Sequence, residues 1–287
     1  MTFKTTPDVA LAARLVGGVW GHLVGDAVGV PYEFRDATHI REVRWGERGT
    51  HQQPPGTWSD DGSLMLALLD SLTADGGGFD VEDQGQRALA WYRNRAYTPD
   101  RDGRFDVGNT TRVALAAIEA GTPAADAGPA DDMNCGNGSV MRILPIALVG
   151  RDLVDGVLID QARRASRVTH GHPRAQVACA LYVLVAVRLL KGESDRAAAL
   201  SESVDVVRAA VSEEPEMVAA LDHLLGWEKR EGRGAVWDSF WSAWDVFAGA
   251  ENYRETIERA IAYGNDTDTT AAIGWARRRL LGGRRHP

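Results

Sequence analysis

Cysteine is scarce in this sequence, and acidic residues outnumber basic ones. Only two of the 287 residues are cysteines. Cys135 and Cys179 are too few and too far apart to form a disulfide scaffold or a CxxC zinc site. The formal charge is −8, from 32 basic and 40 acidic residues. Because proteins bind nucleic acid non-specifically through lysine and arginine, this charge argues against a nucleic-acid partner.

Long apolar runs and a secretion signal are also absent. The longest apolar stretch, 177–190, is interrupted by Arg188 and is shorter than the roughly 18 residues that a membrane-spanning helix needs. The first residues, MTFKTTPD, lack the basic region, apolar core and cleavage site of a signal peptide. With 44% hydrophobic and 25% charged residues, the composition excludes a disordered chain. We expect a monomeric cytoplasmic protein without a membrane partner.

Apolar residues recur at three- to four-residue spacing along most of the chain, which predicts helices. Leu11 and Leu15 begin such a pattern, and Gly25 and Gly29 are expected to break it. Only 40–45 alternates like a strand, and one strand cannot form a sheet. No change in composition marks a domain boundary, so we predict one all-α domain over the whole chain. Further helices are predicted over 63–71, 81–93, 111–120, 153–166, 173–190, 197–211, 215–230, 237–247 and 253–263.

Several common catalytic motifs are missing. The sequence contains no HExxH, GK[ST] or GxSxG segment. A dinucleotide-binding GxGxxG motif fails because Met141 stands where its third glycine would be. An EF-hand counted from Asp266 would place Ala271 at the required glycine and Arg277 at the bidentate glutamate. Zinc-protease, P-loop, serine-hydrolase, Rossmann and EF-hand chemistry therefore lose their sequence support.

Two acidic clusters each precede an apolar helix. A single carboxylate at such a position commonly caps the free N–H groups of the helix and interacts with its dipole. Two neighbouring aspartates fit this role less well, because only one can occupy the cap and the other repels it. With hydroxyls alongside and no cysteine or histidine, the clusters also suit Mg²⁺, Mn²⁺ or Ca²⁺. The composition of the two clusters does not distinguish helix capping from cation binding. The residues are Ser59, Asp60, Asp61, Asp266, Asp268 and Thr269.

A glycine loop, CGNGSVMR at 135–142, precedes another predicted helix. Gly136 and Gly138 permit positive φ angles, so successive N–H groups can point into one concavity and bind a phosphate. The alternative is an ordinary turn that leads into the helix. A single GNGS segment does not decide between these two interpretations.

Taken in order, these segments resemble the ADP-ribosylglycohydrolase family over nearly the whole chain. The similarity begins with GHLVGDAVGVPYEF at 21–34 and GTWSDDGS at 56–63. It continues with DVGNTT at 106–111, GNGSVMRI at 136–143, TH at 169–170 and GNDTDTTAAI at 264–273. The paired SDDG and NDTDTTAAI motifs are its most specific part. The DVGNTT segment is most similar to the branch of dinitrogenase reductase-activating glycohydrolase, which removes ADP-ribose from arginine.

The resemblance implies a compact all-α bundle with two divalent cations, Mg²⁺ or Mn²⁺, at the base of a cleft. Members of this family usually continue after the NDTDTTAAI motif with a helix of small residues and a proline-containing segment. This chain is expected to differ there, because it reads GWARRRLLGGRRHP at 274–287. That difference makes the packing of the last helix an open question. The implied metal ligands are Ser59, Asp60 and Asp61 on one side and Asp266, Asp268 and Thr269 on the other.

The resemblance also implies a reaction, hydrolysis of the bond at C1″ of the distal ribose of ADP-ribose. An ADP-ribosylated protein would be the substrate, with arginine as the expected acceptor, and ADP-ribose the product. Asp106 and Glu33 are the candidates for general acid and base, with Asp106 preferred, and Asp61 would also act in catalysis. The alternatives are serine- or nucleobase-linked ADP-ribose, O-acetyl-ADP-ribose, and ADP-ribose binding without catalysis. The implied substrate-binding residues are Asn109, Gly136, Asn137, Gly138, Ser139 and His170.

Overall fold

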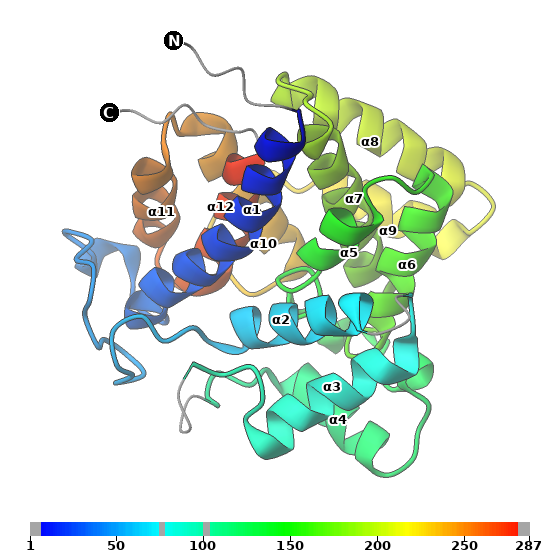
Figure 1. The fold of residues 1–287 in the computed structure, drawn as a ribbon, viewed down its shortest axis with the longest axis horizontal. Coiled ribbons are helices and arrows are strands. Elements are labelled where there is room, and N and C mark those ends of the chain that lie inside the picture. The colour runs from blue at the N-terminus through cyan, green and yellow to red at the C-terminus, as the bar shows by residue number, and fades with distance from the viewer. Residues whose placement is uncertain (1–6, 75–77, 100–103, 281–287) are drawn as a thin grey trace.

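Twelve α-helices joined by loops and short 3₁₀ turns make up the part of the chain that the computed structural model describes, residues 7–74, 78–99 and 104–280 (Figure 1). Of residues 7, 8 and 275–280 only the backbone is described. This part of the chain contains no β-strand, and the predicted all-α fold is confirmed. The helices are α1 (Pro7–Gly29), α2 (Asp60–Thr73), α3 (Val81–Asn94), α4 (Asn109–Glu119), α5 (Leu144–Gly150), α6 (Asp155–Arg167), α7 (Pro173–Leu190), α8 (Arg196–Ala210), α9 (Pro215–Leu225), α10 (Val236–Gly249), α11 (Tyr253–Ala262) and α12 (Thr267–Leu280).

Most helix boundaries lie within a few residues of those predicted from apolar spacing. Helix α7 begins at Pro173, as predicted, because proline at the first helical position loses no helical hydrogen bond. Helix α9 ends at Leu225 rather than at residue 230, because Trp227 turns to donate its ring N–H to Asp238 at 3.2 Å. Helix α5 is absent from the predicted set, because its seven residues are too few for an apolar period to show.

Helix α1 does not end at Gly25 as predicted, but continues through Gly29. Glycine within a helix costs about 0.5–1 kcal/mol relative to alanine, which is why the pattern predicts a break. Here both glycines lie against α12. A Cβ atom at Gly25 would lie 2.7 Å from the carbonyl oxygen of Ala271, and one at Gly29 would lie 2.3 Å from the Cα of Asp268. The glycines therefore let two helix backbones touch, and this contact holds Asp268 beside the end of α1.

The segment 40–45 is irregular, so the predicted strand is wrong. The N–H of Arg44 donates to the hydroxyl of Tyr32 at 2.6 Å, and that hydroxyl donates back to the Arg44 carbonyl at 3.0 Å. A side chain thus takes the hydrogen bonds that a neighbouring strand would supply. The apolar residues Ile40 and Val43 pack against a small cluster around Tyr32, and this packing accounts for the alternating pattern.

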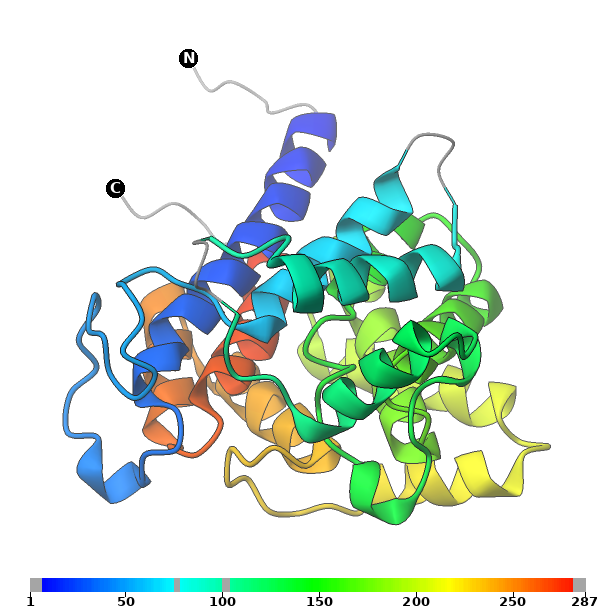
Figure 2. The ribbon, with the colours of Figure 1, turned by 90° about the horizontal axis from the view of Figure 1, so that it is seen from below.

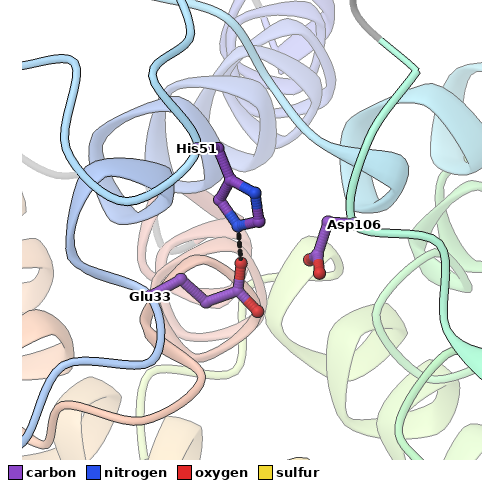
Figure 3. A group of neighbouring side chains, drawn as sticks. All are labelled: Glu33, His51 and Asp106. Atoms are coloured by element: carbon purple, nitrogen blue, oxygen red, sulfur yellow. Dashed lines mark hydrogen bonds and ion pairs between the residues drawn. The ribbon is translucent and has the colours of Figure 1, made fainter.

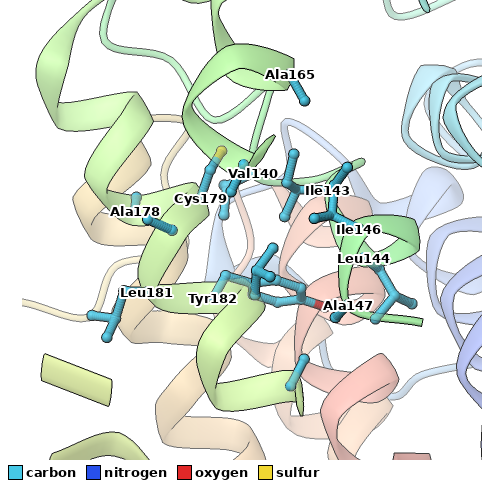
Figure 4. Close-up of a cluster of buried hydrophobic side chains, with 14 of the residues drawn as sticks. Val140, Ile143, Leu144, Ile146, Ala147, Ala165, Ala178, Cys179, Leu181 and Tyr182 are labelled. Carbon is cyan, nitrogen blue, oxygen red and sulfur yellow. The ribbon is translucent and has the colours of Figure 1, made fainter. Parts of the chain in front are cut away.

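Helix α7 forms the centre of the main apolar core. Its residues from Ala175 to Val187 are all buried, and Figure 4 shows Cys179 and Tyr182 of this helix on the side of α5 and of the turn that precedes α5. Among the described helices, α7 is the one that is long and apolar enough to cross a membrane, but 83% of it is buried inside the protein. Such burial is typical of the core helix of a globular fold.

The helices bring the starts of α2 and α12 together. Figures 1 and 2 show α12 running alongside α1, with α10 and α11 next to it, whereas α2, α3 and α4 lie beside one another. The acidic clusters stand at the first turns of α2 and α12. The packing of α1 against both α2 and α12 therefore determines where the two acidic clusters lie relative to each other.

Replacing Gly29 with alanine should destabilise the protein, because the new methyl group would overlap the backbone of Asp268. Overpacking of this kind costs about 1–3 kcal/mol, and occasionally more. The matched control is Gly156→Ala in α6, where nothing lies within 4 Å of the new Cβ atom. Helix propensity should make that change neutral or slightly stabilising. Urea unfolding of both variants measures the difference, and equal stabilities would contradict the close contact of α1 with α12.

Candidate metal centre and active site

The two acidic clusters meet in space. Thr269, at the start of α12, donates its hydroxyl to Oδ1 of Asp61, at the start of α2, at 3.3 Å across 208 positions of sequence. The side chains of Asp60, Asp61, Asp268 and Thr269 are all buried, with at most 4% of each residue exposed. Asp266 is partly exposed at the same place. The fold thus assembles in one buried volume the oxygen ligands that the sequence places far apart.

Capping does not account for the acidic cluster of α2. Ser59 caps this helix, because its Oγ accepts the N–H of Asp61 at 3.2 Å. A second acceptor comes from α1, where the carboxylate of Asp26 accepts the N–H groups of Ser59 at 2.9 Å and Gly62 at 2.7 Å. The N–H groups of Ser59, Asp61 and Gly62 are therefore paired with acceptors other than the carboxylates of Asp60 and Asp61. The carboxylates of Asp60 and Asp61 have a different role.

Asp26 is a member of the site that sequence reasoning missed. It is 0% exposed, and burial raises its pKa to about 7 despite the hydrogen bonds from Ser59 and Gly62. It belongs to the 21–34 segment, in which Gly25 and Gly29 are the residues that the apolar pattern marks. A lone carboxylate within the apolar stretch LVGDAVGV at 23–30 was the available signal, because a charged side chain is rarely buried without a partner.

Seven carboxyl groups gather at the start of α2 and α12, and the pKa of each is raised above its ordinary value. Burial is the largest cause in every case, and for most of them the negative charge of neighbouring carboxylates adds to it. No described lysine or arginine forms an ion pair with any of them. Like charges buried together are unfavourable unless protons or cations neutralise them. The seven are Asp26, Glu33, Asp60, Asp61, Asp106, Asp266 and Asp268.

Unpartnered oxygens lie at the centre of this group. Oδ2 of Asp61 and both carboxylate oxygens of Asp268 are buried without a hydrogen-bond partner. Buried polar atoms are nearly always paired, so these three oxygens fit a bound cation. Glu33, Asp266 and Asp268 also place oxygens within 4.8 Å of one another. An all-oxygen set of this kind suits Mg²⁺, Mn²⁺ or Ca²⁺.

Glu33 and Asp106 face each other beside the acidic centre, with His51 next to them (Figure 3). Nε2 of His51 hydrogen-bonds to Oε2 of Glu33. Burial, and then the charge of Asp106, raise the pKa of Glu33, and burial raises the pKa of Asp106 to about 7. A carboxyl group with a pKa near neutrality can both give and accept a proton at physiological pH. His51 was missed because it lies in a loop without a recognisable motif.

A cavity of about 430 Å³ adjoins these groups. This volume is within the usual range for a small-molecule binding site. The cavity lining does not include Ser59, Asp268 or Ser139. Ser139 lies behind the glycine loop, where its oxygen accepts from Ser166 at 2.9 Å and from Cys179 at 3.4 Å. The predicted residues that line the cavity are Glu33, Asp60, Asp61, Asp106, Asn109, Gly136, Asn137, Gly138, His170, Asp266 and Thr269.

The glycine loop does not use the positive φ angles that its two glycines permit. Neither Gly136 nor Gly138 has a positive φ angle. The N–H of Asn137 donates to the carbonyl of Gly234 at 3.0 Å, so it does not point freely into the cavity. A Cβ atom at Gly138 would lie 2.6 Å from Cε1 of His170. Glycine is therefore needed at position 138 for the close approach of the imidazole and not for a positive φ angle.

Two cavity residues are held in place by specific contacts. Asn137 donates through Nδ2 to Oδ2 of Asp266 at 2.7 Å and to Oγ of Ser239 at 2.8 Å. It therefore positions a carboxylate of the acidic centre. His170 is buried, and its Nδ1 contacts the hydroxyl of Thr169 at 2.9 Å. Burial lowers the pKa of His170 to about 3, with a further contribution from a nearby arginine, so its ring is neutral.

Residues 7–274 match the model of a protein family described as ADP-ribosylglycohydrolase. The chain belongs to the ADP-ribosylglycohydrolase family. This membership confirms the predicted family and the predicted enzyme class, because ADP-ribosylglycohydrolases are hydrolases. The solved structure of an ADP-ribosylglycohydrolase-related protein complex is similar, with a TM-score of 0.78 and 31% identity over 96% of this chain and 89% of that one. The predicted fold type is thereby confirmed as well.

Curated relatives include enzymes named for their substrates. The ADP-ribosylarginine hydrolase Tri1 of Pseudomonas putida (strain GB-1) is 29% identical over 276 residues, which cover 93% of this chain and 70% of the relative. The ADP-ribosyl-[dinitrogen reductase] glycohydrolase of Rhodospirillum rubrum is 26% identical over 276 residues, which cover 91% of this chain and 82% of the relative. Both similarities extend over most of the ADP-ribosylglycohydrolase fold.

The family match ends at residue 274, the position after which the sequence is expected to depart from the family pattern. Up to that point α12 is closely packed, since a Cβ atom at Gly274 would lie 2.7 Å from Cγ2 of Val246 on α10. The α12 backbone continues to Leu280. The side chains beyond Gly274 lie outside the described residues, and so does the predicted effect of this segment on packing.

The raised pKa values predict that the metal-free protein loses stability as the pH rises. Between the ordinary carboxyl value of 3.8 and the folded value of about 7 for Asp26 and Asp106, the folded protein binds more protons than the unfolded chain. Its free energy of unfolding should therefore fall through this window and be lowest above it. Thermal unfolding in chelator, from about pH 5 to pH 8, measures this slope. Mg²⁺ or Mn²⁺ should restore stability at the higher pH, and indifference to both cations would contradict the assignment.

Proposed function

We propose that this chain is a divalent-cation-dependent hydrolase that removes ADP-ribose from modified arginine side chains of proteins. The observation that carries the proposal is a cavity of about 430 Å³ bordered by carboxylates, one of which, Asp61, has a buried oxygen without a partner. The family supplies the class of reaction, which is hydrolysis of an ADP-ribosyl bond. The names of the Pseudomonas putida and Rhodospirillum rubrum relatives support a protein substrate, and the first of them supports arginine as the acceptor.

Two cations, Mg²⁺ or Mn²⁺, would be held between the starts of α2 and α12. Such ions, when bound, supply positive charge that orients hydroxyl groups and lowers the pKa of a bound water. Asp61 and Asp268 offer the unpartnered oxygens, and the Thr269 hydroxyl already contacts Asp61. Two further carboxylates border the cavity directly. The proposed ligands are Ser59, Asp60, Asp61, Asp266, Asp268 and Thr269.

The reaction exchanges one bond at the anomeric carbon. The bond from C1″ to the guanidine nitrogen breaks, the oxygen of a water molecule bonds to C1″, and one proton from that water ends on the leaving guanidine. Positive charge develops at the anomeric carbon in glycosyl transfer, and nearby carboxylates stabilise it. Asp106 is best placed to move the proton, because it lines the cavity and its pKa is about 7. Glu33 lies beside it and is the second candidate.

The rest of the cavity would bind the ADP portion of the substrate. Asn109 lies at the start of α4, and the glycine loop with His170 forms another part of the wall. The neutral ring of His170 can approach a ribose without introducing a charge. Asn137 connects this wall to the acidic centre through its hydrogen bond to Asp266. Together these residues would place the distal ribose next to the carboxylates.

Asp60→Ala and Asp268→Ala should each reduce hydrolysis to background, because each removes a proposed cation ligand. Helical content should stay close to that of the wild type. The assay is release of free ADP-ribose from an arginine-modified protein with Mg²⁺ or Mn²⁺, and again with chelator. Asp205→Ala is the matched control, since Asp205 is exposed on α8. Undiminished release by the wild type in chelator would contradict the cation requirement.

The same assay tests the acceptor. Release from a serine-linked substrate or from O-acetyl-ADP-ribose, but not from the arginine-linked one, would contradict the assignment to arginine. Binding of ADP-ribose without release from any modified substrate would instead identify a non-catalytic protein.

Asp106→Asn should lower kcat by about 100-fold or more, the usual contribution of a general acid or base. Glu33→Gln should lower it less. The pH profile of kcat decides the roles, because the limb that reports the proton-transfer group should disappear only in Asp106→Asn. A larger loss in Glu33→Gln, with that limb intact in Asp106→Asn, would assign proton transfer to Glu33 instead.

A further inference from the structure

The group formed by Glu33, His51 and Asp106 differs chemically from the acidic centre because it contains an imidazole. Each of the three offers one ligand atom, and these atoms all lie within 4.8 Å of one another (Figure 3). The side chains come from three separate segments, the loop after Tyr32, the loop before α2 and the loop before α4. Three loops thus present one nitrogen and two carboxylate groups to a common point.

The surroundings of His51 hold its ring in this position. Its Nε2 already points at a carboxylate oxygen of Glu33. The ring centroid lies 5.7 Å from that of Phe34 and 4.9 Å from that of Phe105, so aromatic side chains lie near the imidazole. Glu33 is 3% exposed, and only 15% of the His51 side chain is exposed. The nitrogen donor is therefore partly buried and oriented before any ion binds.

The spacing of these donors is close to that of a zinc site. Zn²⁺ binds histidine nitrogen and carboxylate oxygen at about 2.0–2.2 Å in tetrahedral geometry, which places neighbouring ligand atoms roughly 3.3 Å apart. The ligand atoms of Glu33, His51 and Asp106 lie within 4.8 Å of one another, so they must approach by up to about 1.5 Å to reach that arrangement. Three protein ligands leave a fourth position, and Glu33 and Asp106 both line the cavity, from which water can enter.

We propose that Glu33, His51 and Asp106 form a second cation site, which takes Zn²⁺ and stops hydrolysis when it is occupied. Imidazole suits Zn²⁺, whereas Mg²⁺ prefers oxygen ligands and octahedral geometry, so the two sites select different ions. The effect on hydrolysis rests on the proposed function. The binding of Zn²⁺ to these three residues does not depend on the proposed function.

Zn²⁺ bound at the second site would stop hydrolysis because it binds both candidates for proton transfer. Glu33 and Asp106 are the two candidates for proton transfer, and a lone pair bound to Zn²⁺ cannot accept a proton. Glu33 also lies within ligand distance of Asp266 and Asp268. Zn²⁺ at the second site would bind the Glu33 carboxylate at the point where it now contacts His51. One ion would therefore withdraw both proton-transfer groups without displacing the cations of the acidic centre.

Cobalt(II) provides a direct test of binding, since it substitutes for Zn²⁺ and absorbs visible light. The full-length protein is titrated with Co²⁺ in excess Mg²⁺, and Zn²⁺ is then added to displace it. His51→Gln removes the nitrogen ligand, and His39→Gln is the matched control because His39 is exposed on the 3₁₀ turn Ala37–His39. Loss of even a residue that supports a metal ligand weakens binding by about 10–100-fold, so His51→Gln should weaken Zn²⁺ binding at least about tenfold.

Asp106→Asn is the second variant, and it should weaken Zn²⁺ binding as well. Circular dichroism of each variant shows that the helices are intact. Equal Zn²⁺ affinity in the wild type, His51→Gln and Asp106→Asn would overturn the proposal, because the ion would then bind elsewhere. Weaker binding in both variants, with no change in His39→Gln, supports it.

Inhibition is measured as the fraction of each protein's own zinc-free rate, in excess Mg²⁺. His51→Gln should need about ten times more Zn²⁺ than the wild type for half inhibition. Equal sensitivity would place the inhibitory ion in the acidic centre and overturn the regulatory part of the proposal. A wild type that hydrolyses no ADP-ribosylated substrate would refute the proposed function, while the Co²⁺ titration would still decide whether the second site exists.

Discussion

Buried negative charge without an opposing cation is the constraint on which this structure depends. Seven carboxyl groups gather where α2 and α12 begin, and among the described residues no lysine or arginine pairs with them. A globular protein gains no stability from such an arrangement, because the desolvation of each group adds to its repulsion from the others. The fold must compensate through its apolar core, whose centre is α7. The acidic centre is therefore better explained by ligand binding than by structural stabilisation.

Close backbone packing is what makes this gathering possible. Gly25 and Gly29 allow α1 to lie directly on α12, which brings Asp26 and Asp268 toward one another from opposite ends of the sequence. Asp26 then accepts hydrogen bonds from the first turn of α2 and attaches that helix to the same place. Three helices are thus joined at one point by two glycines and one carboxylate. Larger side chains at the glycines would separate the ligands that the site requires.

Local signals in the sequence were sufficient for most helices and for the two acidic clusters. Apolar spacing located α7 because its residues are almost all apolar and its first residue is proline. The same reasoning failed at Gly25 and Gly29, since a glycine that breaks a helix and one that admits a neighbouring backbone look alike in one dimension. It failed again at 40–45, where the apolar residues pack beside Tyr32 rather than in a sheet.

The site was predictable in its acidic residues and not in their supporting contacts. Adjacent aspartates before a helix are unusual enough to be noticed, whereas His51 acquires its importance only from its proximity to Glu33. The resemblance to a family supplied the ADP-ribose interpretation of the glycine loop, but the conformation of that loop depends on His170 packing against Gly138. Contacts between distant segments of this kind leave no trace in the local pattern of residues.

Asn137 belongs to two parts of the molecule at once. It stands in the glycine loop that borders the cavity, and its amide nitrogen is bonded both to Asp266 and to Ser239 of α10. Any molecule that shifts the loop must also alter the position of one carboxylate of the acidic centre. Binding of a molecule in the cavity is consequently coupled to binding of a cation in the acidic centre. Thermodynamic reciprocity requires each of these two ligands to change the affinity of the other by the same factor.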